Sequence, residues 1–291
     1  MKNLTPYILI APFAVLIVIF IIGIINALLQ SFGYIPALEL TNFTFDYYRD
    51  IFANETFMSS LQYSLYISIM SSIIATVLGV LICAVLVYTE NTKGISFQIV
   101  RLPILIPHTI VALMVLSVFS QSGMLARLLY NLGIIASQDG FPNIIHNGSG
   151  VGILIAYVWK EAPFVAYFVL ALMQSINKSL GEAAATLGAS PVRAFFTITL
   201  PLSMPAIASA FLIVFAFSFG AYELPYLLGT TLPKALPVQA YIEYIHPDMK
   251  HRPYAMAMNG IIIMLTTTMA FIYFALLQRK TKELEGDIHG Q

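Results

Sequence analysis

The sequence is organised around Glu182-Ala183-Ala184-Ala185-Thr186-Leu187-Gly188, with Ile198-Thr199-Leu200-Pro201 following after nine intervening residues. It is a polar, helix-forming interruption between two long apolar runs. Ser179 and Glu182 have the spacing of a capping box, in which a serine at the N-cap and a glutamate at N3 satisfy the first amides of a helix. The alanines propagate a helix well, and Gly188 suits a left-handed C-terminal cap. The stretch therefore predicts a short helix that ends in a glycine turn.

A second short helix is expected after that turn. Ser190-Pro191 can restart a helix, because proline is tolerated at the first helical position, and Pro201 and Pro205 are expected to end it. Both helices are too short to be stable alone. A spacing of three and four residues places the apolar side chains of each helix on one side, which predicts two small faces: Leu180, Ala183 and Leu187, then Val192, Phe195, Phe196 and Thr199. Apolar residues presented to water usually mark a binding surface.

The composition places the rest of the chain in a membrane. The 291 residues are 59% hydrophobic and only 10% charged, whereas a soluble domain carries about 25% charged residues. The net charge is zero, so nothing global indicates a nucleic-acid partner. Cys83 is the single cysteine, which excludes an internal disulfide and any cysteine–histidine zinc spacing. No metal site is expected.

Apolar runs of about 20 residues can cross a bilayer as helices. The run near the N-terminus is longer than the core of a signal peptide and is followed by no A-x-A cleavage site, so we interpret it as a retained span. Pro103 and Pro107 make the third run the weakest. We expect an all-α, polytopic membrane protein forming one domain over residues 1–291, with six spans: Tyr7–Leu29, Met58–Tyr88, Pro103–Phe119, Val151–Met173, Met204–Leu228 and Ala255–Leu277.

The orientation follows from the lysines and arginines between the spans, which are more frequent on the cytoplasmic side. With the N-terminus inside, the inside segments hold eight: Lys2, Lys93, Arg101, Lys178, Arg193, Arg279, Lys280 and Lys282. The outside loops hold five: Arg49, Arg127, Lys234, Lys250 and Arg252. The bias predicts cytoplasmic termini and a cytoplasmic Glu182 segment, although the loop after the fifth span runs against it.

Two outside loops carry features that could suggest function. The loop 30–57 is aromatic and acidic, and its segment Thr44–Phe52 is expected to form a short surface helix, either an interfacial anchor or a contact for an external partner. The loop 121–150 contains His146 and Gly148-Ser149-Gly150. Ser149 lies among turn formers at a span edge, so an ordinary loop is favoured over a nucleophile.

Several polar residues fall inside the predicted spans, where charges are costly and therefore suggest function. Lys160 and Glu161 lie in the fourth span and point about 100° apart on a helix. Glu223 lies in the fifth span between Gly220 and Pro225, which are expected to loosen that helix and to line a cavity. A structural ion pair and a solute contact both remain open for these charges. The candidates for the solute path are Lys160, Glu161, Tyr222, Glu223 and Tyr226, and His108 is interpreted as a satisfied polar group.

The whole pattern E-A-A-x-x-x-G-x9-I-x-L-P after a fourth span, together with Trp159-x-x-x-Pro163-Phe164 before it, resembles the permease subunits of binding-protein-dependent ABC importers. The resemblance covers essentially the whole chain. It implies the type I permease fold, in which a cytoplasmic coupling loop, here 175–203, fits a groove on the ATPase. Carried over, the docking residues are Glu182, Ala183, Ala184, Leu187, Gly188, Ala189, Phe195, Ile198, Leu200 and Pro201.

The same resemblance implies the partners and the location. They are an ABC ATPase dimer, a second permease subunit that is expected to be a different chain, an extracytoplasmic substrate-binding protein and the lipid bilayer of a bacterial cell. The chain contains no G-x-x-x-x-G-K-[ST] phosphate loop, so ATP and magnesium are expected on the ATPase. No cofactor and no catalytic residue are expected in this chain, which is a transport subunit and not an enzyme.

The substrate is the least constrained inference. The stretches Ser218–Gly229 and Leu236–Tyr241 resemble the spermidine/putrescine branch of these permeases, whereas Pro6–Pro12 through Ser31-Phe32 are equally similar to the sugar and glycerol-phosphate permeases. Glu161 and Glu223 suit a cation and Lys160 does not. Two other classes fit less well: an ion-coupled secondary transporter would leave the coupling-loop pattern unexplained, and an intramembrane enzyme lacks a catalytic constellation.

Overall fold

The computed structural model describes residues 5–90 and 94–289, and within these ranges the chain is helical, with one isolated β-bridge between Ile35 and Leu40. Six helices or runs of helices are long and apolar enough to cross a membrane, which confirms the six-span fold: Leu9–Ser31, Glu55–Tyr88, His108–Asn131, Val151–Thr186, Pro191–Gly220 and Met249–Ala275. Lys2 and Lys93, used above for the orientation, lie outside the described residues, as do the side chains of Arg279, Lys280 and Lys282.

The chain forms two compact units, and the first combines residues 5–58 with 236–265. It contains α1 (Thr5–Ser31), the 3-10 turn η1 (Pro36–Leu38), α2 (Asp46–Ala53), α12 (Leu236–Tyr244), η5 (Met249–His251) and the first part of α13 (Arg252–His289). Helix α2 is the short helix predicted over Thr44–Phe52. The Tyr48 hydroxyl donates to Ser31 Oγ at 2.8 Å, and the Tyr254 hydroxyl donates to Asp50 at 3.2 Å. The aromatic loop is therefore attached to α1 and α13.

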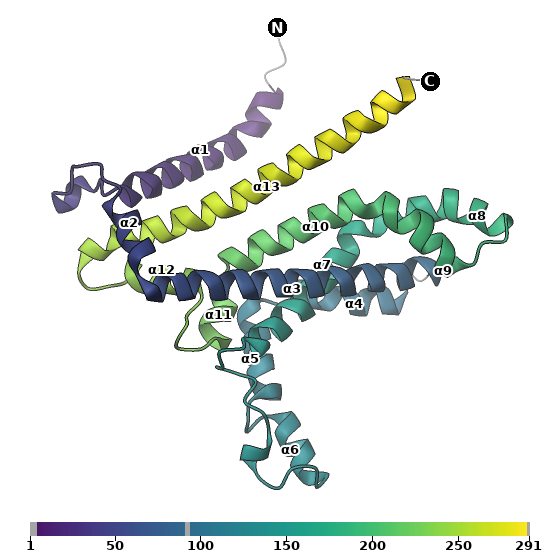
Figure 1. The fold of residues 1–291 in the computed structure, drawn as a ribbon, viewed down its shortest axis with the longest axis horizontal. Helices are drawn as coiled ribbons and strands as arrows, with labels where there is room; N and C mark the ends of the chain where they lie inside the picture. The colour runs from purple at the N-terminus through teal and green to yellow at the C-terminus, as the bar shows by residue number, and fades with distance from the viewer. Residues whose placement is uncertain (1–4, 91–93, 290–291) are drawn as a thin grey trace. The chain divides into compact units, whose positions relative to one another are not determined.

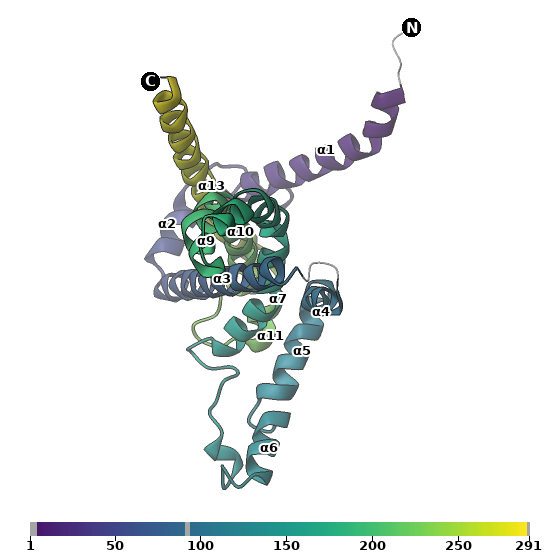
Figure 2. The same ribbon diagram turned by 90° about the vertical axis from the view of Figure 1, so that its right-hand side faces the viewer.

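The second unit holds residues 59–235 and the end of α13. Its elements are α3 (Glu55–Tyr88), α4 (Ile95–Leu105), α5 (His108–Phe119), α6 (Met124–Asn131), η2 (Gln138–Gly140), α7 (Val151–Ile176), α10 (Leu200–Gly220), α11 (Glu223–Leu228) and the helices of the Glu182 segment described below. Helices α7 and α10 lie side by side, while α5 and α6 extend away from them (Figures 1 and 2). Side chains of α3, α7 and α10, among them Cys83, Val165, Met173 and Ala210, form the buried core.

Helix α3 packs closely because its inner face is built from small residues. Ser60, Ser64, Ser68 and Ser72 recur every fourth residue and are all buried. Further along, a Cβ on Gly79 would lie 2.6 Å from both the carbonyl oxygen of Ala162 and the Cβ of Val165. Small residues at such interfaces let helix backbones approach in membranes. The direct contact between α3 and α7 therefore depends on glycine at position 79.

Two of the predicted spans have different boundaries in the structure, and both differences lie at prolines or glycines. The third does not begin at Pro103, which lies inside α4; the helix breaks at Ile106–Pro107 and restarts at His108. The residue before a proline is driven out of the helical region, and Ile106 has an extended ψ of 129°. The fifth does not run unbroken to Leu228, because α10 ends at Gly220 and α11 begins at Glu223. The loosening predicted near Gly220 is thus a complete break, whereas Pro225 is accommodated in the first turn of α11.

The Ser149 loop is an ordinary turn, as predicted. The backbone amide of Ser149 donates to the side-chain oxygen of Asn147 at 2.8 Å, and its hydroxyl donates to the same oxygen. The imidazole Nε2 of His146 instead contacts the carbonyl oxygen of Leu227 at 2.9 Å. Serine and histidine therefore do not act as a pair.

Gly79→Val is expected to destabilise the protein by about 1–3 kcal/mol, because overpacking forces a well-packed interface apart. The measurement is the melting temperature in detergent. Gly23→Val in α1 is the matched control, since a Cβ there has nothing within 4 Å. Equal melting temperatures for the two variants would contradict the close α3–α7 contact.

Candidate functional site

The Glu182 segment is a hairpin whose first arm is a direct extension of α7. After Ile176 the chain forms one π-helical turn, η3 (Asn177–Gly181), and continues into α8 (Glu182–Thr186). The predicted capping box is wrong, because Ser179 lies inside this continuous helix. Its hydroxyl donates to the carbonyl oxygens of Ser175 and Ile176, at 3.0 and 3.3 Å. A helix that does not begin here needs no N-cap.

The turn after α8 has the geometry predicted for it. Gly188 has φ +84°, a conformation that glycine adopts without steric cost. Its amide donates to Ala185 O at 3.0 Å, and the amide of Ala189 donates to Ala184 O at 3.0 Å, which is the Schellman pattern of helix termination. Ser190 then caps α9 (Pro191–Ala194) by accepting the amide of Arg193 at 3.3 Å.

The second arm merges with α10 in the same way. Residues Phe195–Thr199 form a second π-helical turn, η4, in which the amide of Leu200 donates to the carbonyl oxygen of Phe195. Pro201 and Pro205 therefore do not end the helix, contrary to the prediction, and Pro191–Gly220 is one run. Local π adjustments can satisfy the carbonyl groups that proline leaves without a donor. Each arm is thus a continuous helical rod with one wide turn.

The apolar side chains of the hairpin divide into an exposed set and a buried set. Leu180, Leu187, Val192 and Phe196 are exposed, and Leu187 reaches 89%. Phe195 and Thr199, predicted on the docking face, are instead buried at the base, where the Phe195 ring contacts Tyr88 at 6.2 Å between centroids. Of the other predicted docking residues, Glu182, Ala183, Gly188 and Pro201 are exposed, Ala189, Ile198 and Leu200 are half-buried, and Ala184 is buried. We call the four exposed residues Leu180, Leu187, Val192 and Phe196 the hairpin surface.

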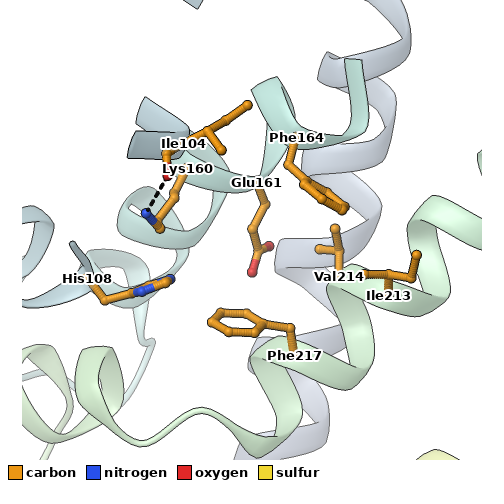
Figure 3. Close-up of a pocket in the computed structure, with 8 residues that line it drawn as sticks. All are labelled: Ile104, His108, Lys160, Glu161, Phe164, Ile213, Val214 and Phe217. Atoms are coloured by element: carbon orange, nitrogen blue, oxygen red, sulfur yellow. Dashed lines mark hydrogen bonds between the residues drawn. The ribbon is translucent and has the colours of Figure 1, made fainter. Parts of the chain in front are cut away.

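A cavity of about 180 Å³ lies between α4, α5, α7 and α10 (Figure 3). It is lined by Ile104, His108, Lys160, Glu161, Phe164, Ile213, Val214 and Phe217. Glu161 is 5% exposed, and its carboxylate points into the cavity (Figure 3). Neither carboxylate oxygen has a hydrogen-bond partner within the described residues. The Ser218 hydroxyl lies beside the Glu161 carboxyl and interacts with it, although its shortest hydrogen bond is donated to the carbonyl oxygen of Val214 at 2.5 Å. Glu161 therefore places a buried carboxyl group, with Ser218 beside it, in an otherwise mostly apolar cavity.

Lys160 points to a different place. Its ammonium donates to the carbonyl oxygens of Pro103 at 3.3 Å and Ile104 at 3.4 Å, and also to that of Ile106. These carbonyls end α4, and the last carbonyls of a helix lack internal donors and carry partial negative charge. Lys160 thus ties α7 to the break between α4 and α5, which supports a structural role for its charge.

A second hollow of about 370 Å³ shares His108 and Phe217 with the first cavity. Ala221, Tyr222, Glu223 and Leu224, from the break after α10, complete it. The Glu223 carboxylate is 56% exposed and lies 3.9 Å from His108 Nδ1. Tyr226 stacks on Tyr222, with ring centroids 4.8 Å apart. The broken helix thus places a carboxylate and two stacked phenols next to the inner cavity.

All five predicted path residues lie in the second unit, and four of them line the two hollows. The sequence did not point to the other lining residues, among them Phe164, Phe217 and His108, the last of which is interpreted above only as a satisfied polar group. His108 is the residue at which the hollows meet, and its ring lies on Phe217 with centroids 5.0 Å apart. The position of His108 directly after Pro107, at a helix start, was the one available signal.

The chain matches the family described as the inner membrane component of binding-protein-dependent transport systems, over residues 92–283. This range is about two thirds of the chain, includes both hollows and the hairpin, and establishes that the chain belongs to this family. It is a permease subunit of an ABC importer, a multi-pass inner-membrane protein and not itself an enzyme. Family membership decides against the ion-coupled transporter and the intramembrane enzyme.

Individual relatives extend the match over most of the chain. The putrescine transport system permease protein PotI of Escherichia coli (strain K12) is 26% identical over 275 residues, covering 89% of this chain and 91% of the relative. The sn-glycerol-3-phosphate transport system permease protein UgpA of Yersinia pestis is 26% identical over 241 residues, covering 80% and 79%. Among solved structures, a chain of a bacterial ABC transporter for alginate import superposes with a TM-score of 0.79 at 20% identity, covering 96% of each chain. This likeness confirms the fold.

Lys160→Met is expected to lower the stability of the protein by about 1.5–3 kcal/mol, the range for hydrogen bonds to a charged group. The carbonyls at the end of α4 would lose their donor. The measurement is the melting temperature in detergent, with Lys250→Met, at an exposed position of η5, as the control. If the Lys160→Met protein has the same melting temperature as the wild type, these hydrogen bonds do not stabilise the protein. Lys160 is then again a candidate for contact with the solute.

Proposed function

We propose that this permease subunit forms half of a solute pathway and is driven by a separate ATPase dimer that docks on the hairpin 182–201, within the loop 175–203. One observation carries the proposal: the hairpin arms are continuous with α7 and α10, the helices that bear Glu161 and Phe217. A displacement of the hairpin would therefore move two walls of the inner cavity directly. The four exposed apolar residues of the hairpin surface are the contact that an ATPase groove would cover.

The docking residues proposed from the sequence are kept, with their roles revised. Glu182, Ala183, Leu187, Gly188, Ala189 and Pro201 contribute to the contact or to the turn that shapes it. Phe195, with Ala184, Ile198 and Leu200, supports the hairpin from behind, and Phe196 and Val192 replace Phe195 on the contact side. This division follows their exposure.

The proposed topology places the hairpin and both termini in the cytoplasm. Lys178 and Arg193 are exposed on the two arms, which agrees with the positive-inside bias. The broken segment Ala221–Tyr222 then lies toward the outer side, where a solute would enter from the binding protein. The remaining partner is a second permease, a different chain, which supplies the other half of the pathway. ATP and magnesium belong to the ATPase, in keeping with the lack of a phosphate loop in this sequence.

The proposed substrate is a small, polar, polyamine-like solute. Glu161 and Glu223 line the hollows, while the Lys160 ammonium donates to backbone carbonyls, so acidic side chains are the ones placed to meet a solute. The similarity to a putrescine permease agrees with this sign. A sugar or glycerol-phosphate substrate is the alternative, favoured by the similarity to the glycerol-3-phosphate permease.

Leu187→Asp is expected to weaken docking without unfolding the chain, because this side chain is 89% exposed. Burying a leucine contributes about 1.5–3 kcal/mol, so ATPase recovered with the purified permease should fall about tenfold or more. Leu132→Asp, in an exposed position beyond α6, is the control. Full ATPase recovery with Leu187→Asp would overturn the proposed docking surface.

Gly188→Val is expected to uncouple ATP hydrolysis from transport, because a β-branched residue is strained at φ +84°. The cause is conformational, since a Cβ at this position meets nothing within 4 Å. Gly188→Asn is the informative partner variant, because asparagine tolerates the left-handed conformation. The measurement is solute uptake per ATP hydrolysed by the assembled importer. If the valine and asparagine variants behave alike, the turn geometry is not what couples the two activities.

A further inference from the structure

The two π-helical turns of the hairpin lie at matching positions on its two arms. The turn η3 ends at Gly181, seven residues before Gly188, and η4 begins at Phe195, seven residues after it. The two turns contact each other. Beyond them lie the short helices α8 and α9, at the ends of α7 and α10 in Figure 1. Each arm therefore has a wide turn where the hairpin meets the membrane spans.

Both turns are closed by the same backbone hydrogen bond. In η3 the amide of Glu182 donates to the carbonyl oxygen of Asn177. In η4 the amide of Leu200 donates to the carbonyl oxygen of Phe195. These bonds reach five residues back, as in a π-helix, whereas those of an α-helix reach four. Each wide turn therefore holds one residue more than an α-helical turn.

A hydroxyl group lies at the centre of each turn. Ser179, the third residue of η3, donates to the carbonyl oxygen of Ser175 at 3.0 Å. Thr197, the third residue of η4, donates to the carbonyl oxygen of Arg193 at 2.7 Å. Hydroxyls that bond to the carbonyl four residues back compete with backbone amides for it and often bend helices. The two hydroxyls therefore favour the wide turns over an unbroken α-helix.

These hydroxyls act on the backbone and not through packing. Ser179 and Thr197 are exposed, whereas Gly181, Phe195 and Thr199 of the same turns are buried. The core thus fixes one side of each turn, and the hydroxyl is bonded on the other. Removing either hydroxyl therefore leaves no cavity in the core.

We propose that η3 and η4 form a hinge between the hairpin and the spans, and that Ser179 and Thr197 are the positioning residues that keep both turns wide. The inference rests on the proposed docking of an ATPase on the hairpin. Because both arms bend at one level, the hairpin tilts as a unit while each arm stays a continuous helix. A turn that returned to the α-helical form would rotate the residues beyond it by about 100°, which would misalign the hairpin surface with its partner.

The test measures this tilt in the permease assembled with its ATPase in nanodiscs. Nitroxide labels are attached at Leu81→Cys, an exposed position of α3, and at Ala185→Cys, an exposed position of α8 beyond the hinge. Cys83 is fully buried and is left in place. The distance between the labels is measured without nucleotide and with ATP plus vanadate. In the wild type this distance should shift between the two states.

Ser179→Ala and Thr197→Val remove the two hydroxyls. Their combined loss should move the equilibrium of the hinge toward the α-helical form by about tenfold or more, so the double variant should lose the nucleotide-dependent shift. Thr89→Val is the matched control, because the Thr89 hydroxyl also donates to the carbonyl four residues back, that of Val85, at 2.7 Å, but outside the hairpin. Ser179→Thr and Thr197→Ser keep the hydroxyls and should shift as the wild type does.

The outcomes separate the hinge from the proposed function. If the double variant shows the same shift as Thr89→Val and the wild type, Ser179 and Thr197 do not position the hairpin and the inference is overturned. If the ATPase binds and hydrolyses ATP while the wild-type labels do not move, the hinge is wrong and the proposed docking stands. If no ATPase is recovered with the wild-type permease, the docking is wrong and the hinge fails with it.

Discussion

The packing of α7 against both α3 and α10 is the constraint on which the second unit depends. Its contact with α3 needs the missing Cβ of Gly79, and its contact with α10 is continuous through the core that contains Val165, Met173 and Ala210. Because lipid competes poorly with close van der Waals packing, such small-residue contacts hold membrane helices together. α7 also carries Lys160 and Glu161 and extends into the hairpin, so its position sets the cavity and the hairpin surface together.

The two π-helical turns lie within long, continuous helices that contain prolines. A proline inside a helix removes a hydrogen bond and crowds the preceding turn. In the second arm, the wide turn at Phe195–Thr199 stands immediately before Pro201, and the helix continues without a break. At Gly220 the helix instead ends, and Ala221 and Tyr222, before the start of α11, line the hollow beside Glu223. The continuous helix can transmit a displacement, whereas the break at Gly220 supplies residues that line the hollow.

The buried polar side chains of the spans have three kinds of surroundings. The serines on α3 form a buried stripe, and their small side chains allow neighbouring helices to approach closely. The Lys160 ammonium donates to the carbonyl oxygens at the end of α4, which have no donor within that helix. The Glu161 carboxyl instead points into the cavity (Figure 3), with the Ser218 hydroxyl beside it. Two adjacent residues of α7 therefore have different surroundings, carbonyl oxygens of α4 at Lys160 and the cavity at Glu161.

Several features depend on local chemistry and were predictable from the sequence: the six apolar spans, the left-handed turn at Gly188, the helix restart at Ser190-Pro191 and the weak point at Gly220. Each follows from the residues of the segment itself. Only the tertiary structure decided which of Phe195 and Phe196 faces water, because a spacing of three and four residues cannot say against which helix a face packs. It likewise decided that Ser179 is no cap, since α7 continues through it, and that Lys160 donates to carbonyl oxygens of α4 while Glu161 points into the cavity (Figure 3). Those outcomes depend on contacts with α3, α4 and α10, which are distant in the chain, and no local pattern of residues encodes them.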